Sequence, residues 1–164
     1  MVRLFLLSAV FFLAGCKSTT YYVSRHAEKA GVMSSDPPLT AWGLQQANDL
    51  QAYLKGKKIG AIYSTDFVRT KATARPTADF FHVPITLYEA SNSTRLVDSL
   101  KAYNQRNVLI IGHSNTVDDI VNRFVGTNAV TDLPDSEYGS LFIVKKRGAR
   151  YNFQKISVPH TAAK

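Results

Sequence analysis

Short apolar or β-prone runs alternate with longer segments of mixed polarity along most of the chain. The runs at residues 21–24, 59–63, 85–88, 108–111, 141–144 and 151–156 predict six strands. The segments between them predict helices over residues 40–54, 66–81, 93–104 and 117–124. Thr40 and Asp66 are the predicted N-caps of the first two helices, and Pro76 predicts a kink or an early end of the second.

Strands that alternate with helices are typical of βαβ units in an α/β fold. We therefore expect a three-layer α/β/α sandwich with a mainly parallel central sheet. Residues 147–150 predict a tight turn that joins the last two strands into an antiparallel hairpin. In such folds ligands bind beyond the carboxyl ends of the strands, so the residues directly after each strand are the candidates for function.

The first fifteen residues have a different character from the rest of the chain. One early charge, Arg3, precedes an apolar run that ends in small residues. This is the layout of a secretory signal, and the run is shorter than the about 20 apolar residues of a membrane span. The run ends in Leu-Ala-Gly-Cys at residues 13–16, which resembles the bacterial lipobox, where cleavage occurs before a Cys that then carries lipid. The resemblance implies lipid anchoring of Cys16 to a bacterial membrane outside the cytoplasm, and Lys17 after it favours the periplasmic face of the outer membrane.

This interpretation divides the chain into four parts. Residues 1–15 are the expected signal peptide, 16–20 a lipidated tether, 21–158 a single globular domain and 159–164 a C-terminal tail. A hydrophobic fraction of 45% and a charged fraction of 20% are typical of a globular protein and argue against wholesale disorder. The single Cys excludes a disulfide scaffold and a Cys-based zinc finger.

The formal net charge of +8 suggests either a basic surface for a polyanion or a basic pocket for a small anion. The basic residues are scattered, with clusters only at residues 55–58 and 145–147. We interpret those clusters as solvated edges and predict no nucleic-acid partner. A pocket for a small anionic ligand then accounts for part of the charge.

Basic residues and histidines follow several of the predicted strands. Arg25 and His26 follow the first strand, Arg69 comes soon after the second, Glu89 follows the third and His113 the fourth. Two Arg and a His can hold a phosphoryl group, because guanidinium groups donate in a fixed fork. A His with a free ring nitrogen can attack phosphorus, and a protonated carboxyl can supply the proton to the departing oxygen. With this set no metal ion is required to neutralise the charge.

At these positions the sequence resembles the histidine phosphatase superfamily, which has the phosphoglycerate mutase-like fold. The resemblance spans about residues 21–125 and rests on four motifs in order: Arg-His-Ala-Glu-Lys at 25–29, Leu-Thr-Ala-Trp-Gly-Leu-Gln-Gln-Ala at 39–47, Ser-Thr-Asp-Phe-Val-Arg-Thr-Lys-Ala-Thr-Ala at 64–74 and Gly-His-Ser at 112–114. It implies no cofactor and no metal.

The family's motifs assign a role to each of the residues at the strand ends. The resemblance implies that His26 forms a phosphohistidine, that Arg25, Arg69 and His113 bind the phosphate, and that Glu89 is the proton donor. The residues after Glu89 lack the pattern that the mutases carry there.

The distance between Glu89 and His113 is short, 23 residues, where the mutases carry a large insertion that shapes a lid. The chain thus resembles the compact phosphatases of the family, acting on a small phosphorylated substrate, a phosphoprotein or a phosphohistidine.

Three other functions stay open. One is a mutase-like phosphotransferase, and another is a lipid-anchored module that binds phosphorylated ligands with a degenerate site. The third is a serine esterase, since Gly-His-Ser-Asn-Thr at 112–116 partly matches a nucleophile elbow, with Ser114 as nucleophile and His160 as base.

Overall fold

The computed structural model describes residues 18–103 and 106–160, and the predicted signal peptide and Cys16 lie outside them. Six strands and four α-helices, with one short 3-10 helix, make up the described fold. In chain order they are β1 (Thr19–Arg25), α1 (Ala41–Leu54), β2 (Ile59–Ser64), α2 (Val68–Phe81), β3 (Ile85–Leu87), η1 (Ala90–Asn92), α3 (Ser93–Tyr103), β4 (Asn107–Gly112), α4 (Val117–Val125), β5 (Ser140–Arg147) and β6 (Arg150–Ser157).

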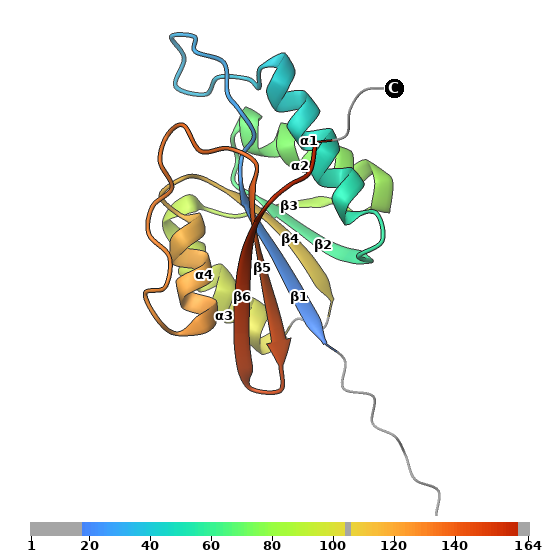
Figure 1. The fold of residues 1–164 in the computed structure, drawn as a ribbon, viewed down its shortest axis with the longest axis vertical. Coiled ribbons are helices and arrows are strands. Elements are labelled where there is room, and N and C mark those ends of the chain that lie inside the picture. Colours follow the sequence, from blue (N-terminus) through green and yellow to red (C-terminus); the bar gives the residue numbers. More distant parts are fainter. Residues whose placement is uncertain (1–17, 104–105, 161–164) are drawn as a thin grey trace, which may run out of the picture.

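All six strands join one sheet in the order β3-β2-β4-β1-β5-β6. The pairs β2–β3, β2–β4 and β1–β4 are parallel, whereas β1–β5 and β5–β6 are antiparallel. The prediction of a mainly parallel sheet with a C-terminal antiparallel hairpin is therefore confirmed. Because the four parallel strands share one direction, their carboxyl ends lie at one end of the sheet (Figure 1).

Two hydrophobic cores lie on opposite faces of this sheet. Side chains alternate along a strand, so Tyr21 and Val23 of β1 face the core beneath α3 and α4, while Tyr22 faces the core beneath α1 and α2. In β4 every residue from Val108 to Gly112 is buried, as expected for a strand that is covered by helices on both faces. The three layers predicted from the sequence are thus present (Figure 1).

The start of α2 differs from the prediction. Asp66 does not cap this helix; its carboxylate pairs with Lys71 instead. The main-chain N–H of Val68 donates to both carboxylate oxygens of Asp36, at 3.0 and 2.9 Å, so the cap comes from the loop after β1. Pro76 lies inside an unbroken helix, because burial of the α2 face that packs on the sheet stabilises the turns on either side of it.

Other element bounds lie close to the predicted ones. Thr40 caps α1 through a hydrogen bond from the Gly43 N–H to its hydroxyl, as predicted. Strand β1 begins at Thr19, two residues before the predicted strand, because Thr19 and Thr20 pair with Lys146 and Lys145 of β5. None of the helices in the described ranges combines the length and apolar character needed to cross a bilayer.

Candidate active site

Four of the five residues predicted near the strand ends gather around one open cavity of about 700 Å³. It lies beyond the carboxyl ends of β1, β2 and β4, where the fold rule for α/β sheets places ligands. Of the predicted site residues, four line this cavity: Arg25, His26, Arg69 and His113. Three separate segments of the sequence therefore contribute to one site, and the lining also includes Lys29 and Phe67.

His26 follows β1 directly and its side chain is almost completely buried. Its Nδ1 lies 2.8 Å from the carbonyl oxygen of Ala27. A carbonyl oxygen can only accept, so Nδ1 carries the proton and the lone pair of a neutral ring is on Nε2. Burial, followed by the charges of Arg25 and Arg69, lowers the pKa of His26 to about 3. At neutral pH the ring is uncharged, and its Nε2 is a nucleophile without prior loss of a proton.

His113 follows β4 and sits beside His26, with 5.6 Å between the ring centroids. Its Nε2 lies 2.9 Å from the hydroxyl oxygen of Thr65, which follows β2 and is itself buried. Burial and the charges of Arg69 and Arg25 lower the pKa of His113 to about 4. This ring is therefore also neutral at neutral pH, and the contact with Thr65 fixes its orientation.

Arg69 lies in the first turn of α2 and contacts two neighbouring groups. One guanidinium nitrogen is 3.2 Å from the carboxylate of Asp36, and the guanidinium carbon lies 4.4 Å from the ring centroid of Phe67. Phe67 also contacts the His113 ring edge to face, at 5.0 Å. The aromatic ring and the carboxylate together hold the guanidinium group at the edge of the cavity.

Arg25 is the last residue of β1 and is held still more firmly. Its Nη1 donates to the carbonyl oxygens of Pro134, Asp135 and Glu137 at 2.9–3.1 Å. The guanidinium carbon lies 4.3 Å from the ring centroid of Tyr138. The Nε–H groups of Arg25 and Arg69 are buried without a hydrogen-bond partner among the described residues. Arg25 and Arg69 both line the cavity together with Lys29, and this concentration of positive charge favours an anionic ligand there.

The loop that follows His26 is fastened to both α1 and α2. Thr40 donates its hydroxyl proton to the Glu28 carboxylate, and the N–H of Glu28 donates to the side-chain carbonyl of Gln46. The N–H of Ala27 donates to the Thr73 hydroxyl on α2. At Gly43 a Cβ atom would collide with the main-chain oxygen of Glu28, so glycine is needed for this close approach. The second and third sequence motifs thus position the nucleophile.

Glu89 lies between β3 and η1, and its side chain is exposed. It is not among the residues that line the cavity, although Ala90 and Ser91 after it are. Two other carboxyl groups, those of Asp119 and Asp135, do line the cavity. The role of Glu89 as proton donor stays a prediction, and the structure adds two candidates for it.

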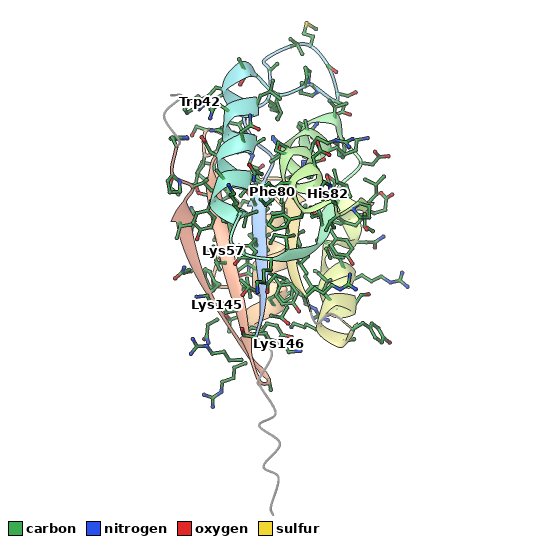
Figure 2. All side chains as sticks on the ribbon, turned by 90° about the vertical axis from the view of Figure 1, so that its right-hand side faces the viewer. Trp42, Lys57, Phe80, His82, Lys145 and Lys146 are labelled. Carbon is green, nitrogen blue, oxygen red and sulfur yellow. The ribbon has the colours of Figure 1, made fainter. Side chains whose placement is uncertain are left out.

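The residues of the esterase alternative lie apart. Ser114 lines the cavity, whereas His160 does not. The His160 Nδ1 is 3.0 Å from a carboxylate oxygen of Asp49, and its ring lies 4.7 Å from that of Trp42 (labelled in Figure 2). His160 therefore cannot act as the base for Ser114 in this arrangement. Within the described ranges no three His, Asp or Glu side chains are grouped so that they could hold a metal ion.

Several contacts at the site were not anticipated from the sequence. Asp36, Thr65 and Tyr138 each touch a predicted site residue from a distant part of the chain. Thr65 lies inside a sequence motif and could have been suspected, but nothing in the local pattern marks Asp36 or Tyr138. Chemically, the cavity offers a neutral imidazole nucleophile beside two guanidinium groups, which suits attack on a phosphoryl group.

Residues 21–93 match the family model of the histidine phosphatase superfamily (branch 1). The resemblance stated from the sequence is confirmed over this range, which includes Arg25, His26, Arg69 and Glu89; His113 lies beyond it. No curated protein matches the chain.

Solved structures of phosphatases share the fold. The protein histidine phosphatase SixA, complexed with tungstate, superposes with a TM-score of 0.69 at 20% identity, covering 84% of this chain and 96% of its own. A mycobacterial glucosyl-3-phosphoglycerate phosphatase gives a TM-score of 0.71 at 13% identity, covering 87% and 100%. Phosphoserine phosphatase from Entamoeba histolytica, complexed with 3-phosphoglyceric acid, gives 0.69 at 16% identity, covering 87% and 98%. At these identities the likeness shows the fold.

Proposed function

We propose that this chain is a histidine phosphatase that hydrolyses phosphomonoesters or phosphohistidine through a phosphohistidine intermediate on His26, without a metal ion. The observation that carries the proposal is the neutral, buried His26 with its lone pair on Nε2, in one cavity with Arg25, Arg69 and His113. The superfamily match over residues 21–93 and the fold shared with phosphatases support it.

In the first step the Nε2 lone pair of His26 attacks phosphorus as the bond to the leaving oxygen breaks. The guanidinium groups of Arg25 and Arg69 and the ring of His113 stabilise the charge on the equatorial oxygens. Because these groups are held by Tyr138, Phe67 and Thr65, they need little reorganisation when the substrate arrives. Water then attacks phosphorus as the P–N bond breaks, its proton passes to the carboxylate that protonated the leaving oxygen, and phosphate and neutral His26 are restored.

The leaving oxygen requires a proton, which a carboxylic acid at the cavity supplies. Glu89 is the donor that the superfamily resemblance implies. Asp119 and Asp135 are the alternatives: all three residues are exposed, but only these two line the cavity. Single replacement of each by Asn or Gln distinguishes them: the donor's loss slows turnover of substrates with a basic leaving group far more than that of p-nitrophenyl phosphate.

The open cavity favours hydrolysis over phosphoryl transfer to a second substrate. Between Glu89 and His113 the sequence has 23 residues, and those that the structure describes form η1, α3 and β4, which is too short a stretch for a lid of mutase size. Water therefore reaches the phosphohistidine, whereas a mutase must exclude it. The phosphotransferase function predicts phosphate exchange between two sugar phosphates, and a degenerate binding module predicts binding without turnover.

We further propose that Cys16 carries lipid and holds the domain on a bacterial membrane outside the cytoplasm, with the periplasmic face of the outer membrane favoured. The lipobox pattern at residues 13–16 supports this. Metabolic labelling with radioactive palmitate tests it: label that survives Cys16→Ser contradicts the anchor.

The enzymatic proposal is tested with residues 17–164, which contain every described strand and helix. We expect turnover of p-nitrophenyl phosphate that EDTA leaves unchanged, and an acid-labile, base-stable phosphoryl-enzyme after a rapid quench. His26→Asn should abolish both, while His82→Asn, at the exposed His directly after α2, should abolish neither. Full turnover by His26→Asn, or complete loss with EDTA, refutes the mechanism.

A further inference from the structure

The end of the sheet opposite the cavity carries a cluster of positive charge. Four basic residues lie at the tip of the β5–β6 hairpin: Lys145, Lys146, Arg147 and Arg150. The strand register places this tip beside the start of β1, since Thr19 pairs with Lys146 and Arg147 lies one residue further out. In Figure 1 the hairpin tip projects beyond the start of β1, away from the loops at the carboxyl ends of the strands.

A second basic segment, the loop between α1 and β2, is linked to the start of β1. Its side chains are Lys55, Lys57 and Lys58. Asn107 connects this loop to the start of β1: its amide donates to the Lys57 carbonyl, and its side-chain oxygen accepts from the Thr20 N–H at 2.9 Å. Figure 2 shows Lys145 and Lys146 toward one end of the molecule, Trp42 toward the other and Lys57 between them. We call the hairpin tip and this loop together the basic end.

Acidic residues are missing from the segments that form the hairpin. Every one of the 12 Asp and Glu residues lies outside residues 99–117 and 138–164. In the part of the chain that the structure describes, the four hairpin cations have no carboxylate within ion-pair distance. Elsewhere basic side chains are paired, as in Arg123 with Asp98 and Lys155 with Glu137. The charge of the basic end is thus left for an external anion.

The sequence also fixes how far this end can be from an anchored Cys16. This step rests on the lipid anchor proposed above. Only three residue steps separate Cys16 from Thr19, and three extended residues span about 10 Å. The start of β1, and with it the hairpin tip, would therefore lie within about one Debye length of the membrane surface.

We propose that the basic end binds the anionic phospholipid headgroups of the membrane that carries the anchor, and so orients the domain. Along β1 from Thr19 to His26 the chain advances seven residues, about 23 Å at the usual strand rise. The cavity then opens away from the bilayer. Its substrate is a phosphorylated molecule of the aqueous compartment or of a facing protein, and headgroup phosphates of the same leaflet are out of reach. A nucleic acid is the other polyanion that such a surface could bind. In the proposed orientation the basic end faces the membrane and is not accessible to it.

Vesicle sedimentation with the unlipidated chain of residues 17–164 tests the surface itself. We expect binding to phosphatidylcholine vesicles that contain about 30% phosphatidylglycerol, weak binding to phosphatidylcholine alone, and loss of binding at high salt. Each basic residue near an anionic surface contributes about five-fold in affinity, so replacing all four hairpin cations by Gln should weaken binding by about 100-fold or more. If that variant fails to fold, Arg147→Gln/Arg150→Gln should still weaken binding by about 20-fold.

The matched control removes four positive charges outside the basic end: Lys71→Gln and Arg75→Gln on α2, Arg95→Gln on α3 and Lys155→Gln on β6. It should retain most of the binding. An equal loss in both variants, or binding that does not depend on phosphatidylglycerol, overturns the proposal. The proposal is also overturned if the protein binds duplex DNA through the hairpin and does not bind anionic vesicles.

Orientation is measured with the intact lipidated protein in vesicles that contain a lipid-borne quencher. Lipidation would leave no free thiol, because Cys16 is the one Cys of the chain. A fluorophore on Ala149→Cys at the hairpin tip should be quenched, and one on the fully exposed Met33→Cys of the loop after β1 should not. Reversed or equal quenching overturns the orientation. Vesicle binding is measured without substrate, and turnover is measured without vesicles. The two experiments therefore distinguish failure of this inference from failure of the phosphatase proposal.

Discussion

Burial of a neutral His26 links the stability of the fold to pH. The side chain is 3% exposed and its pKa in the folded state is about 3, against 6.5 for a hydrated imidazole. In the unfolded chain the ring takes up a proton as the pH falls below 6.5, while in the folded chain it stays neutral until about pH 3. The unfolded state therefore binds more protons across this window, and stability falls as the medium becomes more acidic.

The size of the effect follows from the linkage relation. Each pH unit between the two pKa values costs about 1.4 kcal/mol for one group. From about pH 7 to about pH 5, the buried His26 should remove about 2 kcal/mol of unfolding free energy. At about pH 5 nearly the same figure results from any folded pKa below about 4, so the prediction depends on the direction of the shift more than on its exact size.

The assay is urea denaturation of residues 17–164 at the two pH values, for the wild type and for His26→Asn. The variant has no imidazole to protonate at this position, so it should lose about 2 kcal/mol less than the wild type. His82→Asn is the control: this exposed ring is hydrated in both states, and Asn accommodates its left-handed backbone, where φ is 53°. If the wild type and His26→Asn lose equal stability, His26 is not buried in its neutral form and the argument fails.

Three further changes test other contacts of the site. Gly43→Ala places a methyl group against a main-chain oxygen of the nucleophile's loop, and we expect a loss of about 1–3 kcal/mol in unfolding free energy, measured by urea denaturation. Asp36→Asn keeps an oxygen for the cap of α2 but removes the negative charge beside Arg69, so the KM for p-nitrophenyl phosphate should fall several-fold, and an unchanged KM would contradict this reasoning. Thr65→Val removes the hydroxyl that holds His113, so kcat should fall by about ten-fold or more, whereas Thr65→Ser should retain activity.

The element pattern could be predicted because it is a local property of the sequence. Thr40 lies immediately before a segment of helical periodicity, and the apolar run at residues 108–111 reads as a strand without reference to any other part of the chain. Asp66 shows the limit of such reasoning. It has the side chain of an N-cap in a suitable position, yet the cap is made by Asp36, 32 residues before Val68, which local patterns cannot detect.

Glu89 illustrates a second limit. It follows a predicted strand, as His26 and His113 do, but β3 is a short edge strand and the chain turns directly into η1. Glu89 is not among the residues that line the cavity, whereas Asp119 and Asp135, which are exposed as Glu89 is, belong to the lining. Position after a strand therefore predicts proximity to the site, and the path of the next few residues decides which way a side chain points.

The sequence alone determined the fold class, the four residues that converge and the chemistry they support. Strand periodicity, the rule for parallel connections and the four ordered motifs suffice for that, since each depends on residue type and spacing. Only the tertiary structure decided the protonation state of His26, because a neutral ring results from burial and from two guanidinium charges, one at the end of β1 and one in the first turn of α2. The position of the hairpin cations beside the start of β1, away from the cavity, is likewise decided by the pairing of β1 with β5. Strand register there brings residues more than a hundred positions apart side by side.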